Sequence, residues 1–397
     1  SKEVVADVEV KKRFRTGTMV SGTLSNSWSS TDSTFSTINP AVGSSWKLKV
    51  TQSLAKNARG LVDRAKVAIT RLQVRTNDLK AVDRIEASVQ AVAKGYWDLV
   101  AASEAVRIAQ SALEKAQALE DANREKLDLG LIEEPEWLAS RAHTQGRVEY
   151  LLVTQNERAS ALSKLRLQLN THKEVVIEPS TALVLIDQQV HSDQALQVAF
   201  DFRRELKEAQ WTIQEKGIEV RKTKNERLAD VDLVASFKAN GLEEDYGRSL
   251  NELLTLENPT YFVGMEVSWT LGDKAARAAS DKAQLEKAQA LVDLHRIQKQ
   301  VIHEVDESVR NLRLTQEQVE SRQRVEELYR GRMEAERSRL EAGRSGVQAL
   351  IDTQEDLLEA ERETVEAVAA SQKAWVDLLR AQNRLLDAYG YRSKEMT

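Results

Sequence analysis

Four segments of the chain alternate apolar and polar residues, which is the period of a β-strand with one apolar face. The clearest runs from Tyr261 to Trp269, where every second residue is apolar. Trp46–Thr51 and Val231–Phe237 follow the same pattern, and a weaker version lies in Thr18–Trp28 among serines and threonines. The pattern fits a half-buried sheet of a soluble domain and equally the wall of a membrane barrel. Taken alone, it leaves both interpretations open.

Two much longer segments are typical of helices. Leu61–Leu129 contains no proline and a single glycine, Gly95, and Ala275–Ala342 contains no proline and only Gly331. Apolar residues from Val82 to Leu99 recur in steps of three and four, which is a heptad pattern. At 1.5 Å per residue each helix would be about 100 Å long. That length favours a coiled coil over an ordinary globular helix.

The order of these segments recurs in the two halves of the chain. Val50–Ala55, at the end of one predicted strand, has its counterpart in Val267–Gly272. Leu127–Gly130, at the end of the first long helix, has its counterpart in Leu340–Gly343. Each half therefore predicts two strands, a long helix, a tight turn and a returning helix, and we interpret the chain as an internal duplication.

The returning helices differ in length between the halves. Pro135–Asn170 and Asp193–Arg227 are predicted as two helices stacked end to end, with a short strand at Thr181–Ile186 between them, and together they match the first long helix. In the second half only Val347–Tyr389 returns. We therefore expect one further helix ahead of Ser1. The turn-rich segments between the strands of each pair, 29–43 and 241–259, are predicted as loops.

Composition narrows the classes of function. A chain with 41% hydrophobic and 30% charged residues can bury a core. It has no cysteine, which excludes disulfides and thiol catalysis, and its net charge of -5 argues against nucleic acid as a partner. No run of eighteen apolar residues predicts a membrane-spanning helix, so a membrane role would require a β-barrel. No phosphate-binding glycine loop, zinc motif or nucleophile elbow is visible, and we expect no enzyme, no cofactor and no metal site.

Several local sequences, in this order and spacing, resemble the TolC-like outer membrane efflux protein family over nearly the whole chain. They are Ala93–Ala109, Ala195-Leu196 with Arg203-Arg204-Glu205-Leu206, Leu233–Gly241, Val263–Asp273 followed by Ala275–Ala278, and the two helix-turn-helix tips Leu129-Gly130-Leu131 and Ala342-Gly343-Arg344. The chain departs from the family at two places where the family usually has a proline. One is Arg204, and the other is Leu228-Ala229, just before the third strand.

The resemblance implies a mixed α and β fold in which three copies, with four strands each, close a twelve-stranded transmembrane β-barrel. The barrel would continue into a periplasmic tunnel of long coiled-coil helices. The implied domains are a first barrel hairpin (1–60), a first helical hairpin (61–170), an equatorial connector (171–194), a mid-chain helix (195–229), a second barrel hairpin (230–272), a second helical hairpin (273–390) and a C-terminal tail (391–397).

The resemblance also implies a function and a location. The protein would be a bacterial outer-membrane channel reaching into the periplasm, the exit duct of a tripartite efflux pump or a type I secretion system. Its partners would be two further copies of itself, outer-membrane lipid, a periplasmic adaptor protein and an inner-membrane transporter. The alternative is a soluble, elongated coiled-coil scaffold without channel activity, which explains the long helices but not the strand pair before each one.

The resemblance places the working residues at the two tips. The residues expected to dock the adaptor are Leu129, Gly130, Leu131, Ala342, Gly343 and Arg344. The residues expected to form the periplasmic gate are Glu136 and Asp352, acids that lie just past the tips. Three copies of an acid around a narrow pore would attract cations. The family's further gate acid is replaced here by Ala349.

Overall fold

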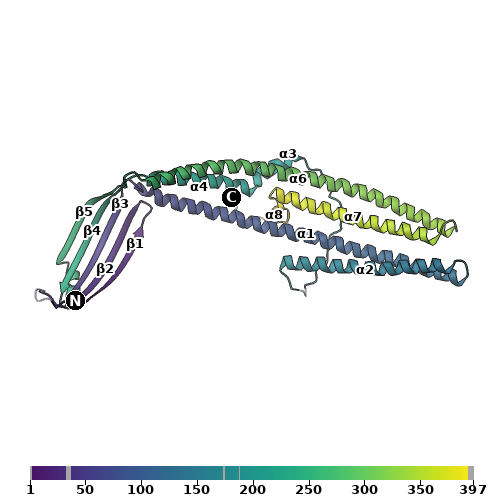
Figure 1. Ribbon diagram of the computed structural model, residues 1–397, viewed down its shortest axis with the longest axis horizontal. Coiled ribbons are helices and arrows are strands. Elements are labelled where there is room, and N and C mark those ends of the chain that lie inside the picture. Colours follow the sequence, from purple (N-terminus) through teal and green to yellow (C-terminus); the bar gives the residue numbers. More distant parts are fainter. Residues whose placement is uncertain (1, 33–36, 173–174, 187, 392–397) are drawn as a thin grey trace. The chain divides into compact units, whose positions relative to one another are not determined.

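The computed structural model describes residues 2–32, 37–172, 175–186 and 188–391 (Figure 1). The chain divides into two compact units. The first, called here the strand unit, combines residues 1–78 with 207–295, and the second, the helical unit, combines 79–206 with 296–397. The two longest helices, α1 (Leu61–Asp128) and α6 (Lys274–Glu341), contribute to both units and confirm the two long helices predicted from the sequence.

The strand unit contains one antiparallel sheet, with five strands among the described residues, neighbouring one another in chain order. The strands are β1 (Lys2–Arg13), β2 (Thr18–Ser30), β3 (Ala41–Ser53), β4 (Asp230–Glu243) and β5 (Asn258–Ser268). The four predicted strands correspond to β2 through β5. The prediction of four strands missed β1, whose alternating valines are interrupted by charged residues on the other face, such as Asp7 and Glu9.

The register of the sheet gathers the apolar side chains on one face. One row across the strands consists of Val10, Gly22, Leu48, Phe237 and Tyr261, each paired with the next. The next row along, on the opposite face, consists of Glu9, Thr23, Lys47, Lys238 and Thr260. Because side chains alternate between faces, the same division repeats along each strand. The rings of the apolar row touch, with 5.3 Å between the centroids of Phe237 and Tyr261.

The second predicted loop, 241–259, contains a helix, α5 (Tyr246–Thr255), which corrects the prediction. The Asp245 carboxylate caps it by accepting a hydrogen bond from the backbone N–H of Gly247 at 2.8 Å. The Ser249 hydroxyl donates to the carbonyl of Gly241 at 3.0 Å, and Leu253 is buried. Gly241 is required there, because a Cβ would lie 2.1 Å from the Ser249 carbonyl oxygen. The helix therefore packs directly on the end of β4.

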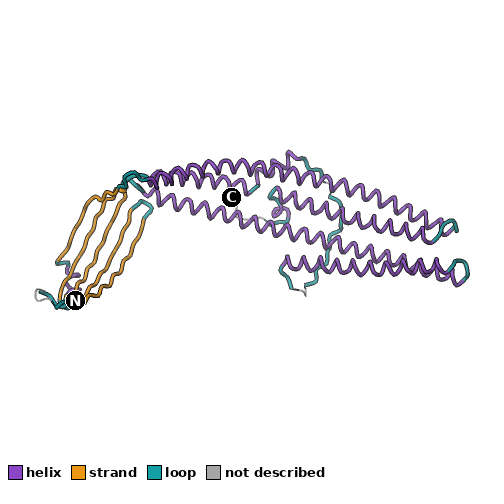
Figure 2. The backbone as a smooth tube through the Cα atoms, in the orientation of Figure 1, coloured by secondary structure: helices purple, strands orange, loops and turns teal. Residues whose placement is uncertain are grey.

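The helical unit holds two helical hairpins (Figure 2). The first joins α1 to α2 (Glu134–Leu169), and the second joins α6 to α7 (Val347–Ala381). Fully buried apolar side chains line the helices, including Leu99, Val305, Leu312, Val319 and Val376. On α6, Val301 is buried as well, whereas Leu291 is exposed.

Two predicted helices are interrupted. The predicted helix Asp193–Arg227 forms α3 (Ser192–Phe202) and α4 (Arg204–Glu226), which meet at the extended residue Arg203. The predicted helix Val347–Tyr389 forms α7 and the short α8 (Leu385–Ala388). The predicted strand Thr181–Ile186 is wrong, because these residues form no ladder with another strand. There the Gln372 side-chain amide donates to the Val184 carbonyl at 2.7 Å. Among the described helices none combines the length and apolarity needed to cross a membrane.

Candidate functional site

The two hairpin tips are built in the same way. After α1, the backbone N–H of Gly130 donates to the carbonyl of Leu127 at 2.9 Å, and that of Leu131 donates to the carbonyl of Lys126 at 2.8 Å. After α6, the N–H of Gly343 donates to Leu340 at 3.0 Å and that of Arg344 to Arg339 at 2.8 Å. Both pairs are the Schellman pattern, which ends a helix at a residue with positive φ. The glycines have φ of 69° and 67°, which glycine adopts without strain.

The tip residues are open to solvent in this chain. Leu129 and Leu131 are 73% and 71% exposed, which is unusual for leucine. Ala342, Gly343 and Arg344 are exposed as well. The geometry is compatible with a docking surface for a partner, and the predicted adaptor contact stays a prediction.

The predicted gate acids also stay predictions. Glu136 is exposed on the first turn of α2, and Asp352 is exposed on α7, where it accepts a hydrogen bond from the Gln348 side chain at 2.8 Å. No described contact joins the two acids. Ala349, in place of the further acid, is half-buried.

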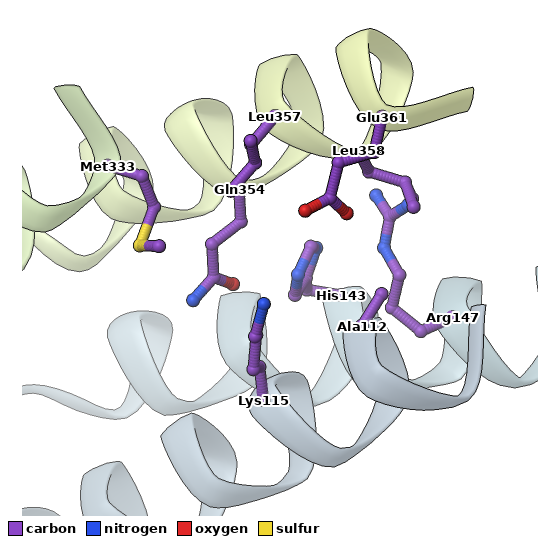
Figure 3. Close-up of a pocket in the computed structure, with 9 residues that line it drawn as sticks. All are labelled: Ala112, Lys115, His143, Arg147, Met333, Gln354, Leu357, Leu358 and Glu361. Atoms are coloured by element: carbon purple, nitrogen blue, oxygen red, sulfur yellow. The ribbon is translucent and has the colours of Figure 1, made fainter. Parts of the chain in front are cut away.

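An ion pair, a buried histidine and a small cavity lie between α2 and α7 beyond the tips. Arg147 lies 2.7 Å from Glu355, and His143 lies 3.7 Å from the same carboxylate. Burial, and then the charge of Arg147, lower the pKa of His143 despite the opposing effect of Glu355. The histidine is therefore neutral at pH 7. The cavity beside it, shown in Figure 3, has a volume of about 20 Å³, enough for one water molecule. This space is too small for a substrate.

A buried charged network lies where the two helix breaks meet. Glu86 of α1 is fully buried, and its carboxylate pairs with Arg204 at the start of α4 and with Arg380 of α7 at 2.9 Å. It also accepts hydrogen bonds from the Asn383 side-chain amide at 2.8 Å and from the backbone N–H of Leu385 at 3.0 Å. One side chain thus holds α1, α4, α7 and α8 together.

The two breaks are also bonded directly to each other. Arg203 donates from Nε to the carbonyl of Ala381 at 2.7 Å, and its other nitrogens pair with Glu205 at 2.6 Å and with Glu304. The backbone N–H of Arg204 donates to the Asn383 side chain at 3.0 Å. A proline in place of Arg204 would have neither this N–H nor a charge for Glu86.

Asp83, one turn before Glu86, completes the network. It lies 2.7 Å from Arg380 and 4.0 Å from Arg204. Burial acts to raise the pKa of the Asp83 carboxyl, but the hydrogen bond and charge of Arg380, with the charges of Arg204 and Arg203, hold the pKa below its usual value. For Arg204, burial lowers the pKa of the guanidinium, and the charge of Asp83 opposes this effect. The arginines therefore keep Asp83 ionised at neutral pH.

The network was missed at the level of sequence. Arg203 and Arg204 stood out as part of a motif, but Glu86 lies among many other acids of a long helix. Its only local signal is its place within the heptad pattern, between apolar Ile85 and Val89. The partners of Glu86 come from α4, α7, α8 and the residues between the last two, so no local pattern could bring them together.

The comparison with solved structures decides the fold. The chain aligns with CusC, a transmembrane channel protein, at a TM-score of 0.75 and 14% identity, covering 96% of this chain and 83% of that one. The alignment with the outer membrane protein VceC of Vibrio cholerae has a TM-score of 0.73 and 13% identity, and it covers 96% of this chain and 86% of that one. The alignment with the outer membrane channel CmeC of Campylobacter jejuni has a TM-score of 0.71 and 14% identity, and it covers 97% of this chain and 78% of that one. This chain has the fold of these outer-membrane channels.

The likeness confirms, at the level of the fold, the resemblance to the TolC-like family and the mixed α and β architecture. No protein-family model and no curated protein sequence matches the chain. At 12–16% identity the structural likeness extends to the path of the backbone and not to individual site residues. No group of acids and histidines suited to a metal ion occurs among the residues described.

Proposed function

We propose that the protein is an outer-membrane channel of bacteria, the exit duct of an efflux or type I secretion system. The observation that carries the proposal is the sheet: one face is apolar across all its strands, on a fold shared with outer-membrane channels. Tyr261, Val263 and Met265 of β5 are each more than 60% exposed. Exposure of this much apolar surface costs free energy in water, whereas contact with lipid is favourable. A coiled-coil scaffold in water would not be expected to expose such an apolar face.

Three copies would close the sheet into a barrel, which removes the unpaired edges of each copy. Strand direction favours four strands from each copy over five. Neighbours in the sheet are antiparallel, so β1 and β5 point the same way, and a five-stranded contribution would make every seam between copies a parallel pair. With β2 to β5 the seam is antiparallel like the rest of the sheet. The proposed barrel therefore has twelve strands, with β1 outside the seam.

The helical hairpins would form the periplasmic tunnel, following the domain bounds expected from the sequence. The matching Schellman turns at Gly130 and Gly343 support an internal duplication and equivalent roles for the two tips. The exposed leucines of the first tip support docking of a periplasmic adaptor protein, which would connect the channel to an inner-membrane transporter.

The test is where the protein partitions and how it associates. Expressed in a Gram-negative host, the chain is expected in the outer-membrane fraction, soluble only with detergent, and trimeric by light scattering corrected for bound detergent. Single cysteines placed in β2 and in β5 would report the seam between copies, because the natural chain contains no cysteine to compete. A monodisperse aqueous monomer or dimer would instead favour the coiled-coil scaffold.

A further inference from the structure

Four arginines line one hollow of the strand unit. Arg15 lies in the turn between β1 and β2, and Arg64, Arg71 and Arg75 lie on the first turns of α1. The hollow has a volume of about 480 Å³. Its other lining side chains are mostly apolar, with Val67 and Leu72 from α1 and Ile218 from α4. It therefore combines apolar side chains with four exposed arginines.

Two glycines fix the turn against the start of the helix. Gly60 has φ of 68°, and a Cβ there would lie 1.9 Å from the Arg15 carbonyl oxygen. Gly17 has φ of 77°, and a Cβ there would lie 2.7 Å from the Asn57 carbonyl oxygen. The backbones can touch only because both side chains are absent. The contact places Arg15 beside the helical face that carries the other three arginines.

None of the four guanidinium groups is neutralised within the described part of the chain. Among the described residues, no carboxylate oxygen lies within 4.0 Å of a guanidinium nitrogen of Arg15, Arg64, Arg71 or Arg75. The acid in the first turn of α1, Asp63, forms an ion pair with Arg13 at 3.4 Å and accepts a hydrogen bond from the Asn57 side-chain amide at 2.7 Å. The hollow is therefore a positive site without an internal counter-charge.

The spacing of these arginines opposes helix stability. Arg71 and Arg75 are four residues apart, where like charges face each other and destabilise a helix. Arg64 lies on the same face, seven residues before Arg71. An anion bound between them would remove the repulsion. Guanidinium groups suit phosphate in particular, because their paired N–H donors match two of its oxygens.

We propose that this hollow binds the phosphate of an anionic phospholipid headgroup. The proposal rests on the proposed function, which puts the apolar sheet face in the membrane and the β1–β2 turn at its helix-side edge, where inner-leaflet headgroups would lie. The apolar lining suits the glycerol and first methylenes of the lipid, whereas a hollow that faced a water-filled lumen would be expected to be polar throughout. Clustered basic residues at a membrane surface attract anionic lipid in this way.

The experiment titrates detergent-purified full-length protein with phosphatidylglycerol and counts bound lipid by native mass spectrometry. The test variant is Arg71→Gln with Arg75→Gln. The control is Arg84→Gln with Arg124→Gln, which removes two exposed arginines of the same helix that likewise have no carboxylate partner. We expect the test variant to bind phosphatidylglycerol about tenfold more weakly or worse, and the control to bind like the natural protein. Inorganic phosphate at millimolar concentration should compete only weakly, because it lacks the apolar part.

Each other outcome overturns the proposal in a distinct way. Equal lipid binding by both variants would remove the site. Full competition by inorganic phosphate would make it a general phosphate site. Loss of the trimer in the test variant would show that the arginines pair with acids of a neighbouring copy, and changed ion selectivity with unchanged lipid binding would place them in the lumen. If the natural protein fails to trimerise or conduct, the proposed function fails; if it conducts without preferring phosphatidylglycerol, only the lipid site fails.

Discussion

Two groups of ion pairs in the helical unit use the same residue types in opposite surroundings. Around Glu86 the charges are buried, and its carboxylate accepts three hydrogen bonds and forms an ion pair with Arg204. Along α6 and α7 the pairs are exposed, as in Arg332 and Asp356, 2.7 Å apart with side chains 58% and 41% exposed. A buried charge without a partner costs several kcal/mol, whereas an exposed pair contributes between zero and about 1 kcal/mol. Stability should therefore depend on the few charges at the helix breaks and not on the many along the hairpin.

The largest effect should come from Glu86→Ala. The change leaves Arg204 and Arg380 with less counter-charge and removes the acceptor of the Leu385 N–H, so the free energy of unfolding should fall by about 3–5 kcal/mol. Denaturant unfolding followed by far-ultraviolet circular dichroism measures it. Glu86→Gln, which keeps the shape and some acceptors, should lose less. A loss below about 1 kcal/mol for Glu86→Ala would remove the contrast between the two groups.

Acid should weaken the buried network selectively. The pKa of Asp83 is lower in the folded chain than its ordinary value, so its contribution is complete above that ordinary value, near pH 4, and is lost as pH falls through the folded pKa. The stability gap between the natural protein and Asp83→Asn should therefore be constant from pH 7 to about pH 5 and shrink below about pH 4. Unfolding midpoints measured across that range test this. A gap independent of pH would contradict it.

The glycines at the tips should show a smaller, local effect. Gly343→Ala forces a side chain into a left-handed conformation, so stability should fall by about 1 kcal/mol. Gly331→Ala, in the exposed interior of α6 with open space around it, is the matched control and should raise stability by up to about 1 kcal/mol. Equal effects at both positions would show that Gly343 is not needed as a helix stop.

The smallest change in stability should follow Arg332→Ala. Its pair with Asp356 is exposed, so the unfolding free energy should change by less than about 0.5 kcal/mol. The comparison in the same unfolding assay with Glu86→Ala gives the size of the contrast directly. A loss above about 2 kcal/mol would mean that the exposed pairs also support the fold, for instance through contacts between copies.

A substitution in the proposed gate should change conduction without changing stability. Asp352→Ala should leave unfolding unchanged, because the side chain is exposed, yet raise single-channel conductance and reduce cation preference. Glu334→Ala, an exposed acid outside the proposed gate, should change neither property. Planar-bilayer recording measures both. Unchanged conductance and selectivity in Asp352→Ala would remove this residue from the gate.

Periodicity alone predicted the elements whose burial repeats regularly. The long helices are confirmed to within a residue or two, and β2 to β5 were each located because one face is apolar. β1 has the same alternation, but its opposite face carries a run of charges, which is uncommon in a strand. α5 was missed inside a turn-rich segment, although Asp245 is a recognisable helix cap.

The functional residues were predictable only where local chemistry marks them. Gly130 and Gly343 follow uninterrupted helices, so a left-handed stop was evident from the sequence. The break at Arg203 has no glycine or proline to mark it, because tertiary hydrogen bonds to Ala381 and Asn383 replace the local signal. The partners of Glu86 lie more than a hundred residues away along the chain, so only the folded structure brings them together.

The measurement closest to the central proposal is the conductance of the purified natural protein in a planar lipid bilayer. If three copies close a barrel whose apolar face meets lipid, discrete and uniform steps of ionic current should appear, with a preference for cations. Protein that is folded and helical by circular dichroism but leaves the bilayer silent, whether added alone or with adaptor protein, would contradict the assignment of the chain as a channel.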